Sequence, residues 1–221
     1  MLSALLFDLD GTLADTNPIH FLSWQKILKR YGLEIEQDFY EDHISGKHNP
    51  QIIRDIFPDM ASEAGIQLAD EKESLFRELA TNLMKPLPGL VDFLNWATTQ
   101  NLQLALVTNA PKANVDFMLN ALELSNTFPV VVLGEELPKA KPDPIPYQIT
   151  LDKLGINAEE AIAFEDSPSG IISAVGANIL TVGVLSTHPT EDLLNAGAKW
   201  LIEDFTDSKL KQILYEHGLL L

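Results

Sequence analysis

The stretch that decides the fold lies near the start of the chain and reads Leu5-Leu6-Phe7-Asp8-Leu9-Asp10-Gly11-Thr12-Leu13. Residues 1–7 are almost entirely apolar, which is typical of a parallel strand covered on both faces. Gly11 gives the backbone the freedom to turn after that strand. Because open α/β sheets bind ligands beyond the carboxyl ends of their strands, Asp8 and Asp10 are expected to face one small ligand. The structural alternative is a loop start in which both aspartates only form turn hydrogen bonds.

Composition limits the class of protein. The chain has 221 residues, of which 46% are hydrophobic and 21% charged, enough for one large domain or for a domain with an insertion. A formal net charge of -17 disfavours nucleic acid and anionic membranes as partners. The absence of cysteine excludes disulfides and a cysteine nucleophile. No apolar run approaches the roughly 18 residues of a membrane span and no basic leader is present, so we expect a cytoplasmic protein.

A helical region follows the first strand. Apolar residues recur at helical spacing, which predicts helices over 18–31, 35–43, 49–57 and 67–84 without an intervening strand. The stretch Lys85-Pro86-Leu87-Pro88-Gly89 is rich in residues that break helices and marks a boundary. We therefore expect residues 15–84 to form a helical cap domain over the carboxyl edge of the sheet, inserted into a core domain of residues 1–14 and 85–221.

The remainder of the chain alternates between helical and strand patterns. Strands are predicted over 103–108, 129–133, 160–164, 179–183 and 198–202, and helices over 89–99, 111–122, 144–154, 168–175 and 206–216. This alternation predicts an α/β fold, a Rossmann-like three-layer parallel sheet with helices on both faces. The chain contains neither a Walker-type nor a dinucleotide-type glycine fingerprint, so a nucleotide cofactor is not expected.

Polar residues follow two further predicted strands. Thr108 and Asn109 end the strand 103–108, where a hydroxyl and the free amides of the next helix can hold phosphoryl oxygens. Either residue can instead simply cap that helix. In the loop after the next strand, Lys141 precedes a proline that restricts its backbone to an extended conformation, whereas Lys139 is expected to be solvated.

Two acids, Glu165 and Asp166, end the predicted strand 160–164. They could serve as metal ligands, or Asp166 and Ser167 could only cap the following helix. Together with Asp8 and Asp10 they would make a cluster of carboxylates that repel one another unless a cation lies among them. A metal ion and a fixed lysine would together supply the positive charge that such a cluster needs.

The run Asp8-Leu9-Asp10-Gly11-Thr12-Leu13 resembles the first signature of the haloacid dehalogenase-like hydrolase superfamily. The other three strand ends resemble its second, third and fourth motifs in order and spacing, so that the resemblance covers essentially the whole chain. It implies phosphoryl transfer, with Asp8 as the nucleophile and Asp10 as the general acid and base. It also implies that Thr108 contacts the phosphoryl group and that Lys141 offsets negative charge beside Asp8.

The same resemblance implies a magnesium site. Mg²⁺ binds few carboxylates and retains several waters, so Asp8, the backbone carbonyl of Asp10, Asp166 and a phosphate oxygen would suffice, with Glu165 assisting. The insertion between the first and second motifs resembles the subgroup with a helical cap. That subgroup includes sugar-phosphate and phosphoglycolate phosphatases, phosphonate hydrolases and β-phosphoglucomutase.

Cap residues bear on the substrate. His20 and Trp24 lie four residues apart on one predicted helix face and resemble residues of the sugar-phosphomutase branch, although both could also pack the cap. Lys47 and Asn109 are expected to contact substrate. Asn49 stands where the mutase branch has an arginine, which weakens the mutase interpretation.

We therefore expect a magnesium-dependent phosphatase that hydrolyses a small phosphate monoester, such as a sugar phosphate, through an aspartyl-phosphate on Asp8. The alternative is a β-phosphoglucomutase-like phosphohexomutase. A phosphorelay receiver is disfavoured because Asp8 ends the first strand rather than the third. A non-catalytic binding scaffold is disfavoured because the motif residues are intact. The sequence determines neither the physiological substrate nor the oligomeric state. It is compatible with a monomer.

Overall fold

The computed structural model describes residues 1–219 and divides the chain into two compact units. One unit combines residues 1–15 with the chain from residue 85 onward, and the other comprises Thr16–Met84. The first unit contains a six-stranded parallel sheet in the order β3-β2-β1-β4-β5-β6. Its strands are β1 (Ala4–Phe7), β2 (Gln103–Thr108), β3 (Val130–Leu133), β4 (Ala161–Glu165), β5 (Leu180–Val184) and β6 (Trp200–Ile202). The predicted parallel α/β fold is confirmed.

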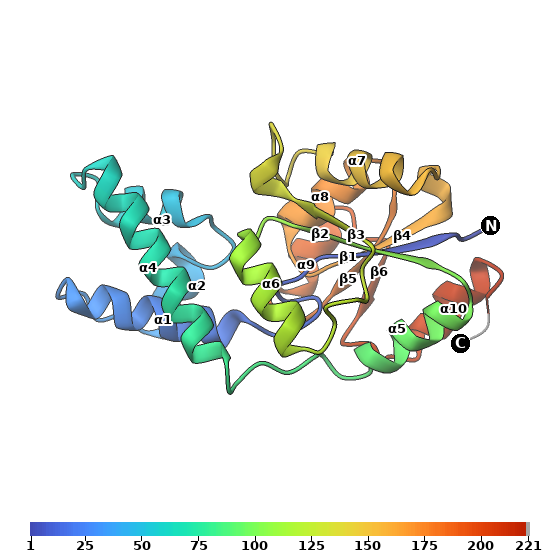
Figure 1. The fold of residues 1–221 in the computed structure, drawn as a ribbon, viewed down its shortest axis with the longest axis horizontal. Coiled ribbons are helices and arrows are strands. Elements are labelled where there is room, and N and C mark those ends of the chain that lie inside the picture. Colours follow the sequence, from blue (N-terminus) through green and yellow to red (C-terminus); the bar gives the residue numbers. More distant parts are fainter. Residues whose placement is uncertain (220–221) are drawn as a thin grey trace. The chain divides into compact units, whose positions relative to one another are not determined.

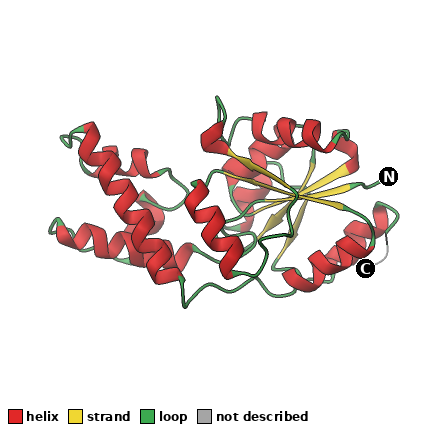
Figure 2. Cartoon of the chain, viewed as in Figure 1, coloured by secondary structure: helices red, strands yellow, loops and turns green. Residues whose placement is uncertain are grey.

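Helices cover both faces of this sheet (Figures 1 and 2). On one face lie α7 (Ile145–Leu154) and α8 (Pro168–Gly176), and on the other lie α5 (Leu90–Thr99) and α10 (Lys209–Glu216). The unit also contains α6 (Lys112–Ala121), α9 (Thr190–Asn195) and the 3-10 turns η1 (Gly134–Glu136) and η2 (Ala158–Glu160). Sequence periodicity did not predict α9, because a helix of six residues is too short to display an apolar stripe.

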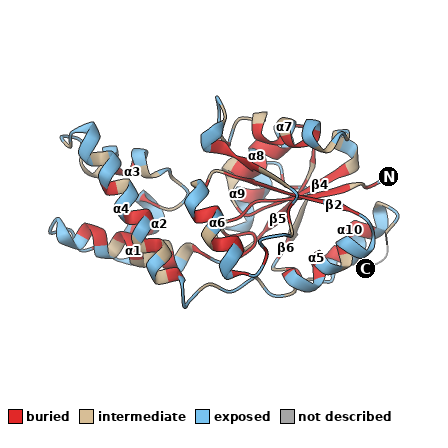
Figure 3. Ribbon diagram, viewed as in Figure 1, coloured by how far each residue is buried: buried red, intermediate tan, exposed pale blue. Residues whose placement is uncertain are grey.

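The two faces of the sheet pack in different ways. Against α7 and α8 the strands present many alanines and Val107, around the buried ring of Tyr147. On the opposite face Phe7 stacks on Phe164 with ring centroids 5.1 Å apart, and Phe93 meets both rings edge-on. Figure 3 shows the strands as the most continuously buried part of this unit. Because β1 is buried on both faces, the backbone that carries Asp8 is held by packing from either side.

The helical unit contains α1 (Asn17–Arg30), α2 (Gln37–His43), α3 (Asn49–Ile56) and α4 (Ser62–Ala80). Its core is a cluster around Trp24, which is 1% exposed, so this tryptophan packs the unit. The predicted start of the last helix at residue 67 was wrong, because α4 begins at Ser62. The first turn of α4 is mostly exposed and carries no buried apolar side chain for the pattern to detect. Among the helices of residues 1–219, none is long and apolar enough to cross a membrane.

Candidate active site

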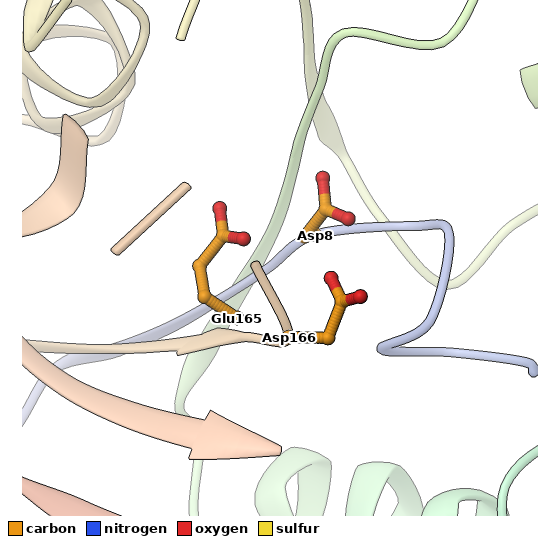
Figure 4. Close-up of side chains that lie close together, drawn as sticks. All are labelled: Asp8, Glu165 and Asp166. Carbon is orange, nitrogen blue, oxygen red and sulfur yellow. The ribbon is translucent and has the colours of Figure 1, made fainter. Parts of the chain in front are cut away.

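Three carboxylates meet where β1 and β4 end. The two strands pair with Phe7 opposite Phe164, and the backbone N–H of Asp8 donates to the carbonyl of Phe164 at 3.0 Å. Asp8 therefore lies beside Glu165 and Asp166. Each of the three offers a carboxylate oxygen, and these oxygens lie within 4.8 Å of one another. Figure 4 shows the cluster at the ends of the two strands. All three residues are buried, so water screens their mutual repulsion poorly.

Lys141 supplies positive charge inside this cluster. Its Nζ lies 2.6 Å from Oδ1 of Asp8, 2.6 Å from Oε1 of Glu165 and 2.6 Å from the carbonyl oxygen of Val107. An ammonium group has three hydrogens to donate, and these contacts use all three. The side chain is only 3% exposed, whereas that of Lys139 is 66% exposed and pairs with Asp143 at 2.9 Å. Of the two lysines in this loop, Lys141 is the one in the cluster.

Burial changes the proton affinity of the cluster. It raises the pKa of Asp8, although Lys141 partly opposes that effect. In the same way burial raises the pKa of Glu165 to about 7, again against the opposing effect of Lys141. Burial also raises the pKa of Asp166 well above its ordinary value, and the Asp8 carboxylate adds to this. For Lys141, burial works to lower the pKa, but the neighbouring Asp8 and Glu165 outweigh it and raise the pKa. The lysine therefore stays cationic, and the carboxylates need further positive charge to ionise together.

Tyr147 of α7 completes the surroundings of the lysine. Its hydroxyl donates to Oε1 of Glu165 at 2.5 Å, and its ring centroid lies 5.4 Å from Nζ of Lys141. Burial, followed by the nearby carboxylates Glu165 and Asp8, raises the pKa of the tyrosine well above its ordinary value. The phenol thus remains protonated and can act as a donor. The sequence contained no signal for Tyr147, because it lies within a helix and ends no strand.

The donor set fits a hard cation such as Mg²⁺. Oε2 of Glu165 is buried and has no hydrogen-bond partner within residues 1–219, whereas the other oxygen has two. Buried carboxylates are stable when they are paired or coordinate a metal, and Mg²⁺ prefers oxygen ligands. The cluster of Asp8, Glu165 and Asp166 includes three of the four predicted metal residues. The fourth, Asp10, is half-buried and was expected to contribute its backbone carbonyl.

Gly11 allows the two acidic loops to approach. Its φ is +74°, a conformation that favours glycine, and its N–H donates to the carbonyl of Ala14 at 2.8 Å. A Cβ at this position would overlap the Asp166 carboxylate. The glycine after Asp10 is therefore required both by the turn and by the close contact with the second loop.

Thr108 and Asn109 lie at the end of β2. The buried Thr108 hydroxyl accepts a hydrogen bond from the N–H of Ala110 at 3.0 Å, so its own hydrogen can be donated to a ligand. The Asn109 amide donates to the carbonyl of Lys141 and accepts from the N–H of Lys141, both at 3.1 Å. The expected substrate residue Asn109 thus connects the Lys141 loop to the neighbouring strand end.

Sequence reasoning missed residues of the loop after β5. The hydroxyl of Thr187 donates to Oδ2 of Asp166, and Nδ1 of His188 lies 3.1 Å from the Asp166 carbonyl oxygen. Ser186 donates to the carbonyl of Gly11. A signal was present, because these polar residues follow the end of a strand just as the predicted site residues do.

The remaining predicted substrate residues belong to the helical unit. Nδ1 of His20 lies 2.6 Å from Nζ of Lys72, and the His20 ring stacks on Phe76 with centroids 4.2 Å apart. Lys72 is 2% exposed and pairs with Glu73 at 2.9 Å. Lys47 lies between α2 and α3 and pairs with Asp55 at 3.3 Å. Sequence analysis did not single out Lys72, because its burial depends on the packing of α4 against His20 and Trp24 of α1.

Two known proteins are similar to this chain over almost its whole length. A phosphorylated carbohydrates phosphatase of Thermotoga maritima is 30% identical over 209 residues, which cover 91% of this chain and 94% of the relative. The β-phosphoglucomutase of Bacillus subtilis is 26% identical over 226 aligned positions, covering 97% and 95% of the two chains.

A solved structure extends the comparison. A mutant of CbbY from Rhodobacter sphaeroides, crystallised in complex with xylulose-(1,5)bisphosphate, has a TM-score of 0.82 and 25% identity. The match covers 94% of this chain and 96% of that one. Residues 5–184 match the haloacid dehalogenase-like hydrolase family. With that match spanning most of its length, the chain belongs to the haloacid dehalogenase-like hydrolases.

Proposed function

We propose that this protein is a phosphatase that hydrolyses a phosphate monoester of a small metabolite through an aspartyl-phosphate on Asp8. The observation that carries the proposal is the position of the Lys141 ammonium, 2.6 Å from both Asp8 and Glu165 within a buried acidic cluster. A carboxylate nucleophile must approach a phosphate that is itself negative, and a fixed cation reduces this repulsion. The phosphatase activity of the Thermotoga relative supports the same reaction.

The chemistry divides between the two aspartates of the first motif. A carboxylate oxygen of Asp8 attacks phosphorus, and the bond from phosphorus to the leaving oxygen breaks while Asp10 gives that oxygen a proton. Asp10 then takes a proton from a water molecule, whose oxygen attacks the aspartyl-phosphate. This step releases inorganic phosphate and restores Asp8. Thr108 donates its hydroxyl hydrogen to a phosphoryl oxygen.

Asp8, Asp166 and the Asp10 carbonyl, with Glu165 beside them, would hold Mg²⁺. When bound, the ion supplies positive charge that lets Asp8 and Asp166 ionise together and that attracts the phosphate. The cap residues His20 and Lys47, and Asn109 in the core, remain candidates for substrate contact. We propose that the helical unit serves as the cap.

One observation favours a sugar phosphomutase as the second candidate. His20 is held in contact with Lys72 at 2.6 Å, and a histidine at this position resembles the one that assists proton transfer in the mutase branch. Asn49 weighs against the mutase. Its amide donates to Glu73 at 2.5 Å, so an acid-bound amide occupies the position where the mutase branch has an arginine.

The first experiment measures phosphate release from sugar phosphates, phosphoglycolate and nucleotides, with Mg²⁺ or with chelator, while following isomerisation of β-glucose 1-phosphate. We expect magnesium-dependent phosphate release from one class of monoester. Isomerisation to glucose 6-phosphate with little free phosphate would favour the mutase instead. Absence of both reactions across the panel would count against both assignments.

The nucleophile has a separate test. Asp8→Asn should abolish turnover and leave the fold intact, as judged by circular dichroism and melting, because the amide cannot attack phosphorus. Asp10→Asn should slow both half-reactions. Appreciable metal-dependent turnover by Asp8→Asn would remove the nucleophile assignment, and unchanged steady-state turnover by Asp10→Asn would remove its acid and base role.

A further inference from the structure

The loop after β5 contacts both acidic loops of the candidate site. Ser186 donates to the carbonyl of Gly11 in the first loop, and Thr187 donates to Oδ2 of Asp166 in the second. These contacts join segments that are 175 and 21 residues apart in the sequence. Because these hydrogen bonds connect segments that are far apart in the sequence, they fix the position of Asp166 relative to the loop that follows Asp8.

Oδ2 of Asp166 is enclosed by the protein itself. Thr187 lies on it from one loop, and Gly11 approaches so closely that a Cβ there would overlap Oδ2 and lie 3.1 Å from Cγ2 of Thr187. Thr187 and Gly11 thus lie against Oδ2, whereas Oδ1 of the same carboxylate accepts no hydrogen bond within residues 1–219. A free carboxylate, by contrast, rotates between several arrangements.

His188 contacts both the Thr187 hydroxyl and the backbone of Asp166. Its Nδ1 lies 3.0 Å from Oγ1 of Thr187 and 3.1 Å from the carbonyl oxygen of Asp166. A carbonyl oxygen can only accept, so the single Nδ1 hydrogen points toward the Asp166 carbonyl and can be shared with the Thr187 hydroxyl oxygen. The Thr187 hydroxyl has two acceptors on Asp166, the carbonyl oxygen at 3.2 Å and Oδ2, and Oδ2 is the nearer.

We propose that Thr187 is a positioning residue of the metal site, which holds the Asp166 carboxylate so that its other oxygen faces the cation. The inference rests on the proposed magnesium site. Partners that orient metal ligands are worth about 10- to 100-fold in metal affinity. Thr187 does not touch the phosphoryl group in this proposal and acts only through Asp166.

The test measures the Mg²⁺ dissociation constant by isothermal titration calorimetry without substrate. Thr187→Val keeps the shape and removes the donor, and Thr187→Ser keeps the donor. The matched control is Thr190→Val, the same change at an exposed position of α9. We expect the dissociation constant to rise about 10- to 100-fold in Thr187→Val and to stay near the wild-type value in Thr187→Ser and Thr190→Val.

The outcomes separate this inference from the proposed function. If the wild type binds Mg²⁺ and Thr187→Val binds it equally well, the positioning role is wrong and the proposed function stands. If Thr187→Ser is as weak as Thr187→Val, the hydroxyl is not the cause and the positioning role is again wrong. If the wild type does not bind Mg²⁺, both proposals fail. Should Thr187→Val not fold by circular dichroism, Thr187→Ala replaces it in the same comparison.

Discussion

At the scale of single residues, Lys141 determines whether the acidic cluster can exist. All three of its hydrogens are donated, to Asp8, Glu165 and the Val107 carbonyl. Removing one partner of a buried ion pair leaves an uncompensated charge, which costs about 3–5 kcal/mol. The same ammonium would offset charge on a phosphate bound next to Asp8. Lys141 is therefore expected to contribute both to stability and to turnover.

Lys141→Met should lower kcat about 10²- to 10³-fold, the usual cost of losing a preorganised charged donor. It should also lower the melting temperature, because Asp8 and Glu165 lose their counter-charge. Lys139→Met, a change on the exposed lysine of the same loop, is the control and should alter neither quantity. Steady-state kinetics and thermal melting measure both effects.

A double variant separates the two contributions. Adding Glu165→Gln to Lys141→Met removes one of the uncompensated carboxylates and should recover part of the melting temperature while kcat stays low. Recovery of kcat together with stability would mean that the lysine only holds the fold.

At the scale of elements, the site residues that the sequence could predict are those that lie at the ends of the parallel strands. Asp8, Thr108 and Asp166 lie at such ends, and parallel register brings consecutive strand ends to one edge. Tyr147 could not be predicted, because its contact with Glu165 depends on how α7 packs on the sheet. Thr187 does follow the end of a strand, so its place at this edge of the sheet could have been predicted, but its contact with Asp166 depends on the path of the loop after β5.

The first turn of α8 packs directly against the Glu165 carboxylate of the acidic cluster. Gly170 lies in the first turn, its N–H donates to the Ser167 hydroxyl at 3.1 Å, and a Cβ on it would overlap the Glu165 carboxylate. That carboxylate is fully buried and bonded to Lys141 and Tyr147, so it cannot swing aside without losing both. Position 170 therefore requires glycine, although glycine is unfavourable within a helix.

Gly170→Ala should accordingly lower stability and activity, although alanine is ordinarily better in a helix by about 0.5–1 kcal/mol. Gly65→Ala within α4 is the matched control, since its Cβ would meet only Ile53 at 3.4 Å, an ordinary contact. The control should raise the melting temperature without changing turnover. Denaturant unfolding and phosphatase assays of the two variants measure the contrast. Equal effects of the two substitutions would mean that the Glu165 carboxylate moves freely.

At the scale of the whole molecule, negative charge dominates. Acidic residues number 32 against 15 basic ones, and the formal net charge is -17. Any salt should screen part of this self-repulsion and raise the melting temperature. Three of the acids lie buried together at the candidate site, where mobile ions cannot screen them well. A specifically bound cation should therefore stabilise the molecule beyond what screening achieves.

MgCl₂ at about 100 times its dissociation constant should stabilise the fold by about 2.7 kcal/mol. For a chain of this length, that corresponds to a rise in melting temperature of roughly 5–10 °C over NaCl at matched ionic strength. Asp166→Asn is the control, because it removes a cluster carboxylate yet leaves the surface charge almost unchanged. In this variant MgCl₂ and NaCl should act alike, since only screening remains. If MgCl₂ stabilised the variant as much as the wild type, the ion would bind elsewhere on the acidic surface, and the buried cluster would not be the metal site.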